Sequence, residues 1–340
     1  MRLVACERAV YDAGVPTSYH PNVQTHGPVP VHEPVHEPVH EPVHEPVHGP
    51  APVIRRVGTQ RDILGECPLW DERSNGLWWV DIRAPALRHW QPESQVLRSW
   101  PMPELIGSIA LTDDHRLLVA LATRLALFDP SSGTFETLAE PGFTNPDHRF
   151  NDGRCDRQGR FWVGSMNNIT RAPEGRLYCF DLAHGLVEVM GAICIPNSLA
   201  FSPDGRTMVF ADSLRHAIEV FDYDIATGRP GAARPFARIT PPAFPDGSCI
   251  DAEGGLWNAE FHAARLVRYM PDGAIDRIVP LPVQRPTCCS FGGADLATLF
   301  VTTTSQHMGA AELAAEPLAG ALLALDVGLR GLPEPRFKNA

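Results

Sequence analysis

Four oxygen-bearing side chains occupy one recurring position of a repeated sequence pattern. They are Glu66, Asn151, Asn197 and Asp246, and each stands five residues before the start of an expected turn. Carboxylates and amide carbonyls are hard oxygen donors of the kind that Ca²⁺, Mg²⁺ or Mn²⁺ prefers. No histidine or cysteine stands at these positions, which argues against a thiolate or imidazole zinc site. The residue types therefore indicate a divalent-cation site, provided that the fold brings them together.

The turn that follows each of these positions has a common form. After Asn151 it reads Asp-Arg-Gln-Gly at 156–159, with glycine where a positive φ costs least, and a short apolar strand follows at 160–164. Two weaker copies of the pattern place Ser108 and Thr287 at the same position. The six positions are separated by 42, 43, 46, 49 and 41 residues, so one structural unit recurs at a nearly constant length.

The repeat length predicts the fold. A period of about 40 to 50 residues that contains several short strands is typical of one β-propeller blade. We therefore predict an all-β fold, a six-bladed β-propeller whose four-stranded blades surround a central metal site. Radial repetition would turn the equivalent loop position of every blade toward one axis. The last strand, 320–326, is expected to close the ring beside the first strand, and helical periodicity is confined to 309–319.

The first fifty residues have a different composition. Val-His-Glu-Pro repeats four times between residues 31 and 46, and proline at every fourth position opposes both helix formation and strand pairing. We predict a disordered low-complexity extension over residues 1–50 and one propeller domain over residues 51–340. The histidines of the extension leave open whether it collects metal ions weakly or has no function of its own.

Four motifs in the body of the chain match a known family. They are GECPLW at 65–70, RFNDG at 149–153, PNSLAFSPDG at 196–205 and FPDGSCID at 244–251. In this order and at blade spacing, they resemble the gluconolactonase and regucalcin (senescence marker protein) family of six-bladed propeller lactonases, over residues 54–330. The resemblance implies hydrolysis of a sugar lactone and one bound divalent cation, Ca²⁺ first, with Zn²⁺, Mn²⁺, Mg²⁺ or Fe²⁺ as alternatives.

The resemblance also assigns roles to individual residues. The implied metal ligands are Glu66, Asn197 and Asp246, and Asp246 is in addition the best candidate for a catalytic general base, because a carboxylate at the metal can accept the proton of an attacking water. The predicted substrate-binding residues are Arg149, Asn151, Asn167 and Asn168. Many family members carry an acidic residue shortly after a Gly-x-Met motif, whereas here Gly-Ser-Met at 164–166 is followed by the two asparagines. This departure leaves the identity of the sugar open.

Four further residues lie near the expected centre. Asp152, Asp212 and Ser213 could orient the ligands from a second layer, and His262 could line the pocket. For each of them a purely structural role is the alternative.

Two other functions remain compatible with the sequence. A cation site of this kind could serve a broader esterase or organophosphate hydrolase, and a propeller could also act as a non-catalytic Ca²⁺-binding scaffold. A scaffold has no need for four oxygen donors at one repeated position, so lactone hydrolysis is preferred.

Composition excludes several partners. The 340 residues include 44% hydrophobic ones, enough for a sizeable core, and the formal net charge of −11 argues against nucleic-acid binding. No apolar run approaches the roughly 18 residues of a membrane span. Residues 1–8 lack the apolar segment of a secretory signal, so the eight cysteines are expected to be reduced thiols in a cytoplasmic protein. We expect a small-molecule sugar lactone as the partner and a monomer or weak homo-oligomer.

Overall fold

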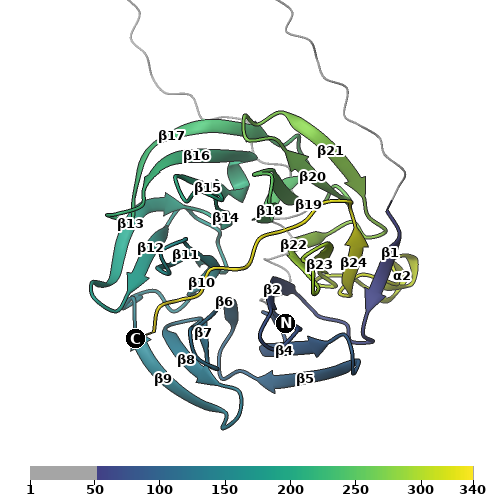
Figure 1. The fold of residues 1–340 in the computed structure, drawn as a ribbon, viewed down its shortest axis with the longest axis horizontal. Helices are drawn as coiled ribbons and strands as arrows, with labels where there is room; N and C mark the ends of the chain where they lie inside the picture. The colour runs from purple at the N-terminus through teal and green to yellow at the C-terminus, as the bar shows by residue number, and fades with distance from the viewer. Residues whose placement is uncertain (1–51, 340) are drawn as a thin grey trace, which may run out of the picture.

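The computed structural model describes residues 52–339, which form six four-stranded antiparallel sheets arranged as a ring (Figure 1). The prediction of a six-bladed β-propeller is confirmed. The predicted extension of residues 1–50 lies outside the described residues. Within residues 52–339, no helix is long and apolar enough to cross a membrane.

In five of the blades the four strands are consecutive in the chain, and in every blade the innermost strand precedes the next two. Blade 1 contains β2 (Gly65–Asp71), β3 (Gly76–Asp81), β4 (Ala86–Gln91) and β5 (Val96–Pro101). Blade 2 contains β6 (Ile106–Leu111), β7 (Leu117–Leu121), β8 (Leu125–Asp129) and β9 (Thr134–Ala139). Blade 3 contains β10 (His148–Cys155), β11 (Phe161–Asn167), β12 (Gly175–Asp181) and β13 (Gly185–Ile193).

The second half of the ring repeats this order. Blade 4 contains β14 (Pro196–Phe201), β15 (Thr207–Asp212), β16 (Ala217–Asp224) and β17 (Arg229–Arg238), with the short 3-10 helix η1 (Ser213–Arg215) between β15 and β16. Blade 5 contains β18 (Phe244–Ile250), β19 (Leu256–Phe261), β20 (Arg265–Tyr269) and β21 (Ile275–Pro280). Blade 6 contains β22 (Pro286–Gly292), β23 (Thr298–Thr303), β24 (Leu322–Asp326) and β1 (Ile54–Val57).

Blade 6 closes the ring with strands from both ends of the described chain. β1 pairs antiparallel with β24, with Ile54 opposite Leu325 and Val57 opposite Leu322. This is the closure that the sequence predicted. The expected helical segment is also present, as α2 (Ala310–Ala315) between β23 and β24.

The turns between the first two strands of the blades have the geometry that the sequence predicted. Gly159, Gly205 and Gly254 have φ angles of 85°, 71° and 88°, which only glycine adopts at low cost. The backbone N–H of Gly159 donates to the Asp156 carbonyl at 3.1 Å, which closes the turn between β10 and β11.

The hydrophobic core lies between the blades. Six clusters of buried side chains each combine residues of two neighbouring blades, so every blade is held by both of its neighbours. Inner strands are buried along most of their length, as in β6 and β7, whereas the outermost strand β9 has exposed or half-buried residues throughout. Burial that decreases outward is the expected consequence of radial packing, because only the outer strand faces solvent.

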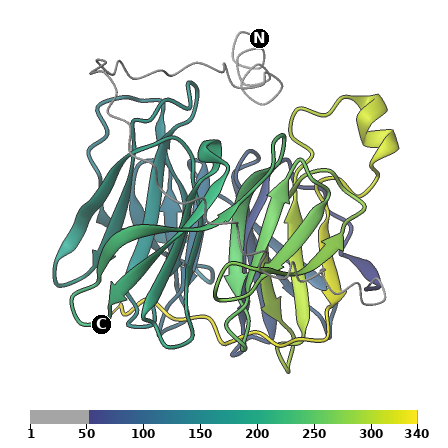
Figure 2. The ribbon, with the colours of Figure 1, turned by 90° about the horizontal axis from the view of Figure 1, so that it is seen from above.

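A segment that follows the last strand crosses one face of the ring (Figures 1 and 2). We call residues 327–339 the C-terminal strap. Gly331 bridges to Asp251 of blade 5, and the Phe337 N–H donates to the Leu111 carbonyl of blade 2 at 2.8 Å. Between them, Glu334 pairs with Arg154 of blade 3 at 3.4 Å. The strap therefore connects blades that are not neighbours in sequence, on the face opposite to α2.

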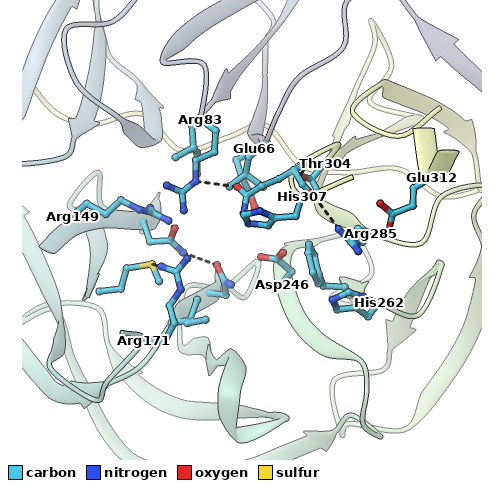
Figure 3. A pocket seen from close by; sticks show the side chains of 18 residues that line it. Glu66, Arg83, Arg149, Arg171, Asp246, His262, Arg285, Thr304, His307 and Glu312 are labelled. Atoms are coloured by element: carbon cyan, nitrogen blue, oxygen red, sulfur yellow. Dashed lines mark hydrogen bonds between the residues drawn. The ribbon is translucent and has the colours of Figure 1, made fainter. Parts of the chain in front are cut away.

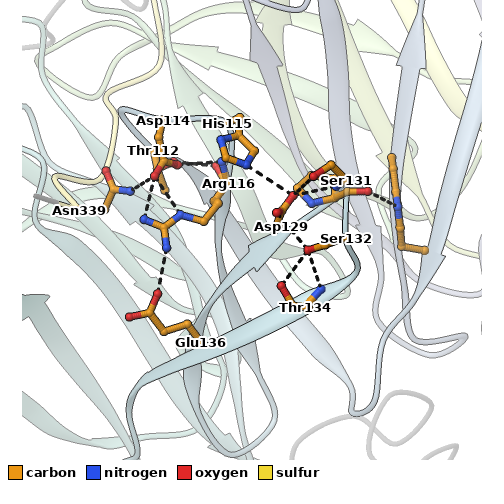
Figure 4. A network of polar contacts seen from close by, with 12 residues as sticks. Thr112, Asp114, His115, Arg116, Asp129, Ser131, Ser132, Thr134, Glu136 and Asn339 are labelled. Carbon is orange, nitrogen blue, oxygen red and sulfur yellow. Dashed lines mark hydrogen bonds and ion pairs between the residues drawn. The ribbon is translucent and has the colours of Figure 1, made fainter.

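The end of the strap also joins a polar network on blade 2 (Figure 4). The Asn339 amide donates to Asp114 at 2.8 Å, and Arg116 pairs with the same carboxylate at 2.7 Å and with Glu136 at 2.9 Å. Hydrogen bonds from Arg116, Thr112 and Asn339 hold the pKa of Asp114 below its usual range, although partial burial opposes them.

A buried histidine in blade 1 makes stability depend on pH. His89 stacks on Trp78 with ring centroids 4.1 Å apart, and burial, with a smaller contribution from Arg98, lowers its pKa to about 4. Because the unfolded chain takes up this proton near the ordinary pKa of 6.5 and the folded chain does not, stability is lost as the pH falls from about 6.5 to about 4. The loss attributable to this residue is about 2 to 3 kcal/mol.

His89→Phe is expected to flatten this part of the stability profile, measured by urea unfolding at pH 4, 5, 6 and 7. His115→Phe is the matched control, since the side chain of His115 is 68% exposed. A profile that keeps its full slope in the His89 variant would show that another group causes the loss.

Candidate functional site

A pocket opens at the centre of the ring, and four inner strands each contribute one side chain with a carboxylate or amide oxygen (Figure 3). Glu66 comes from β2, Asn151 from β10, Asn197 from β14 and Asp246 from β18. The two asparagines and Asp246 are 6 to 9% exposed, and Glu66 keeps part of its surface open to the pocket. The fold thus brings together the four residues that the repeat singled out.

The sequence analysis expected these residues in loops, and in this it was wrong. All four lie within strands, at irregularities of the pairing with the second strand of the blade. Glu66 pairs with Val80, and regular pairing resumes only at Leu69. A bulge of this kind bends the strand and changes the direction of its side chains. It therefore allows a residue inside a sheet to face the central axis.

At two of the bulges the next residue has a left-handed backbone. Cys67 has φ 50° and Ser198 has φ 60°, an uncommon conformation for residues other than glycine. Surrounding contacts hold both in place: Cys67 Sγ accepts the Ile109 N–H at 3.4 Å, and the Ser198 hydroxyl donates to the Asp246 carbonyl at 2.5 Å. The backbone beside the pocket is thereby fixed by neighbouring blades.

In the other two blades, the residue at the shared position does not line the pocket. Ser108 and Thr287 are completely buried and do not line it. Thr287 instead donates to the Gly65 carbonyl at 2.5 Å and so connects blades 6 and 1. In blade 2, a Cβ at Gly107 would lie 2.6 Å from two carbonyl oxygens of β10, so glycine is required for the close approach of β6 and β10. In these two blades, the residue at the repeated position is buried between strands and does not face the pocket.

A chain of hydrogen bonds orients the two asparagines. Arg149 donates to Asn151 Oδ1 at 2.7 Å, and Asn151 Nδ2 donates to Asn197 Oδ1 at 3.1 Å. Asn197 Nδ2 in turn donates to the Ser213 hydroxyl at 2.8 Å, which donates to the Pro245 carbonyl at 2.7 Å. The chain runs from blade 3 to blade 5 and leaves the second lone pair of the Asn197 carbonyl available to a ligand.

The carboxylates of the pocket are in an unfavourable environment for negative charge. Burial, and next the nearby charge of Asp152, raises the pKa of Glu66 to about 8. Burial and then Glu66 raise the pKa of Asp246 well above its usual range. Burial also raises the pKa of Asp152, whose carboxylate accepts the Leu199 N–H at 3.0 Å. Buried carboxylates that lie close enough for the charge of one to raise the pKa of another form a favourable environment for a cation.

The donor set fits a divalent cation that prefers oxygen. Glu66 and Asp246 supply two carboxylates, and Asn197 supplies an amide carbonyl. Within residues 52–339 no group of three or more histidine, cysteine, aspartate and glutamate side chains is placed to hold a metal ion.

The predicted substrate residues are placed differently from one another. Arg149 and Asn151 line the pocket, whereas Asn167 and Asn168 do not. Asn167 is 2% exposed, and its Oδ1 accepts the N–H groups of Ile169 and Thr170. Asn168 Oδ1 accepts a hydrogen bond from Arg149 Nε at 2.7 Å. In this structure the two asparagines shape the loop and hold Arg149, and their contact with substrate stays a prediction.

Sequence reasoning missed several residues of the pocket. His262 lines it, as considered, but so do Arg83, Arg171, Arg285, Gln306, His307 and Glu312. These six lie in connections between strands, outside the repeated pattern, and the sequence contains no periodic signal that would single them out. Apart from Glu312 on α2, they belong to segments without regular structure, whose position depends on the finished ring.

Comparison with known proteins agrees with the geometry. Residues 64–305 match the model of the SMP-30/Gluconolactonase/LRE-like region. The chain is 35% identical to a 6-deoxy-6-sulfogluconolactonase of Pseudomonas putida, over 84% of this chain and 98% of the relative. It is 39% identical to an L-arabinolactonase of Azospirillum brasilense, over 85% of this chain and 96% of the relative.

A solved structure extends the similarity to the whole ring. A calcium-binding protein, regucalcin from Agrobacterium tumefaciens, superposes with a TM-score of 0.81 at 30% identity, and the match covers 84% of this chain and 97% of that one.

Proposed function

This chain belongs to the SMP-30/gluconolactonase/LRE-like family, and on that premise we propose that it hydrolyses a sugar lactone at the central pocket, with the help of one divalent cation. The observation that carries the proposal is the convergence of four oxygen-bearing side chains from four different blades. Two relatives are sugar lactonases, which supports the reaction class.

The residues that would hold the cation are Glu66, Asn197 and Asp246. Ca²⁺ is the first candidate, because the donors are hard oxygens and one similar structure is that of a calcium-binding protein. When bound, such a cation supplies a Lewis acid that polarises the lactone carbonyl and lowers the pKa of a nearby water. The remaining chemistry falls to side chains of the protein.

Asp246 is proposed as the general base. Its carboxylate accepts a proton from water as the water oxygen adds to the lactone carbonyl carbon. As the tetrahedral intermediate collapses, the bond from that carbon to the ring oxygen breaks, and the proton returns from Asp246 to the ring oxygen. The product is the open hydroxy acid. Asp246 lines the pocket, so its carboxylate faces the space in which a water and the lactone would meet.

Arg149 and Asn151 are proposed to position the substrate. Both line the pocket, and the bond from Arg149 to Asn151 Oδ1 fixes the amide so that its carbonyl faces the guanidinium. A pre-oriented guanidinium loses little freedom when it binds the hydroxyl or ring oxygens of the lactone. The Asn151 amide already donates to the Pro196 carbonyl and to Asn197 Oδ1, so it is proposed to accept a sugar hydroxyl with its carbonyl oxygen. Met166, Ile82 and Phe261 give the pocket apolar walls against which the sugar ring can pack.

Hydrolysis of a lactone panel tests the proposal. Metal-stripped protein is assayed with pentonic and hexonic lactones after addition of Ca²⁺, Mn²⁺, Zn²⁺, Mg²⁺ or Fe²⁺. With at least one cation, the rate is expected to be well above that of spontaneous hydrolysis. Without added cation, the rate is expected to equal that of spontaneous hydrolysis. Turnover of aryl esters or phosphotriesters but of no lactone would favour the broader hydrolase. A flat panel combined with Ca²⁺ binding would favour the non-catalytic scaffold.

A further inference from the structure

The C-terminal strap closes the end of the ring that lies opposite to the pocket. Figure 1 shows the strap crossing the middle of the ring, and Figure 2 places it on the face opposite to α2, whose Glu312 lines the pocket. Strap residues 332–335 and residues of the inner strands β10, β14 and β18 line a cavity of about 20 Å³. This is room for about one water molecule, so the strap packs closely against blades 3, 4 and 5.

One strap residue is connected to the ring through a buried ion pair. Glu334 pairs with Arg154 of β10 at 3.4 Å, and the two side chains are 12% and 11% exposed. The Ser290 hydroxyl of β22 donates to the same carboxylate at 3.4 Å, and Arg154 also donates to the Ser248 carbonyl of β18 at 2.9 Å. The ion pair therefore joins the strap to the inner strands of blades 3, 5 and 6.

Arg154 lies on a strand that leads from the pocket to the strap. β10 carries Asn151, which lines the pocket, and is followed by the turn whose Gly159 carbonyl accepts the Lys338 N–H of the strap at 3.1 Å. Arg154 lies between these two ends, two residues after Asp152. Its contacts with Glu334 and Ser248 hold its guanidinium at the strap end of the ring.

The charges between the strap and the pocket act on one another. Burial raises the pKa of Asp152, and the charge of Arg154 is among the influences that oppose this rise. After burial, the charge of Asp152 contributes to raising the pKa of Glu66 and of Asp246. Asp152 therefore lies close enough to interact both with Arg154 and with the two proposed carboxylate ligands of the cation.

A buried arginine needs a carboxylate partner, because an unpaired buried charge is costly. Burial opposes the positive charge of Arg154, but the charge of Glu334 helps to raise the pKa of Arg154 above its usual range. Asp152 is another carboxylate whose charge acts on Arg154. Without Glu334, the guanidinium would be drawn toward Asp152, and its positive charge would then oppose a cation at the neighbouring ligands.

We propose that Glu334 is a positioning residue for the cation site: it holds Arg154 toward the strap and so keeps this positive charge away from the cation ligands. The inference rests on the cation site of the proposed function and adds to it a residue from the opposite face. Phe337, three residues further along the strap, packs in the cluster between blades 2 and 3 and takes no part in this ion pair. The strap thus contributes to cation affinity without touching the pocket.

Glu334→Gln tests the positioning role through cation binding, which needs no turnover. Metal-stripped wild-type protein and the variant are titrated with Ca²⁺ and with Mn²⁺ by calorimetry. We expect the variant to bind at least about 10-fold more weakly, because a unit charge that moves closer to a divalent cation in a partly buried site opposes binding by at least this factor. Glu93→Gln, which removes the same charge at an exposed position of blade 1, is the matched control and should bind like wild type.

A second substitution separates positioning from support of the fold. The double variant Glu334→Gln/Arg154→Met replaces both members of the ion pair, so no arginine is left to move toward the cation ligands. Replacement of a buried ion pair by uncharged side chains of similar volume is often tolerated. We therefore expect the double variant to bind the cation within about 3-fold of wild type. If the strap only supported the fold, the double variant would bind more weakly still, because it also loses the bond from Arg154 to Ser248.

The outcomes distinguish this inference from the lactonase function. If Glu334→Gln does not fold, Glu334→Asp, which keeps the charge but withdraws it by one methylene, gives the same readout with a smaller loss. Unchanged cation binding in a folded Glu334 variant, or a double variant as weak as Glu334→Gln, overturns the inference and leaves the lactonase function intact. If wild type binds the cation but hydrolyses no lactone, the lactonase function fails, and the rescue by the double variant still supports the role of Glu334. A wild-type protein that binds neither cation overturns the inference together with the cation site.

Discussion

Asp246→Asn is expected to lower kcat/KM for lactone hydrolysis at least about 1000-fold. The substitution removes a carboxylate that is proposed both to bind the cation and to accept the proton of the attacking water, and loss of a general base alone costs about 10²- to 10⁴-fold. The measurement is the initial rate with saturating cation, across a range of lactone concentrations.

The same substitution is not expected to lower the stability of the metal-free protein. Burial and then the charge of Glu66 raise the pKa of Asp246, so without a cation the ionised carboxylate of Asp246 destabilises the folded state. The metal-free Asn variant should therefore melt at a temperature no lower than that of metal-free wild type at pH 8, with Asp272→Asn, on an exposed turn of the same blade, as the control. Near-normal turnover by a folded Asp246 variant would refute the mechanism. If the variant loses activity because it is unfolded, the loss says nothing about the role of Asp246 as a base, and the stability measurement identifies this case.

Phe337→Ala is expected to reduce the free energy of unfolding by about 3 to 5 kcal/mol, the range for truncation of a fully buried aromatic side chain. Phe337 has no exposed surface, and it stacks on Phe180 of blade 3 with ring centroids 5.5 Å apart. It belongs to the cluster between blades 2 and 3, so its loss leaves a cavity between two blades. Urea unfolding followed by tryptophan fluorescence measures the change.

Leu182→Ala is the control for this experiment, because Leu182 follows β12 of the same blade and is 49% exposed. A change within about 0.5 kcal/mol is expected for it. The strap lies on the face opposite to α2, so folded Phe337→Ala protein should keep its kcat/KM at 25 °C. An unchanged unfolding free energy would show that the strap contributes nothing to the ring.

The repeat could be predicted from the sequence because each blade needs the same local structure. A glycine turn with positive φ and a short apolar strand recur at fixed spacing, and residues such as Gly159 and Gly254 have the predicted backbone. The ring closure by β1 and β24 followed from the same periodicity. Features that depend on local sequence in this way can be predicted without knowledge of distant contacts.

Other features depend on contacts between distant segments and could not be predicted from the sequence. Glu66 was expected in a loop, but it lies within a strand. It pairs with Val80, and the bulge that interrupts the pairing comes between Glu66 and Leu69. Ser108 and Thr287 share the repeated position but became buried, since the close approach of neighbouring strands leaves them no route to the pocket. Arg83 and Arg171 reach the pocket from connections that no repeat specifies. The roles of the predicted site residues, and the cytoplasmic location, stay predictions.

The pairing of β1 with β24 sets the order in which the protein can be completed during synthesis. Ile54 leaves the ribosome long before Leu325, so blade 6 cannot form until the other five blades have been synthesised. Until then, blades 1 and 5 each present an apolar flank that blade 6 later covers. Contacts between residues so distant in sequence are slow to form, and exposed flanks favour association with other chains. Ribosome-bound chains that end before Leu322 are therefore the species in which chaperone binding should be strongest.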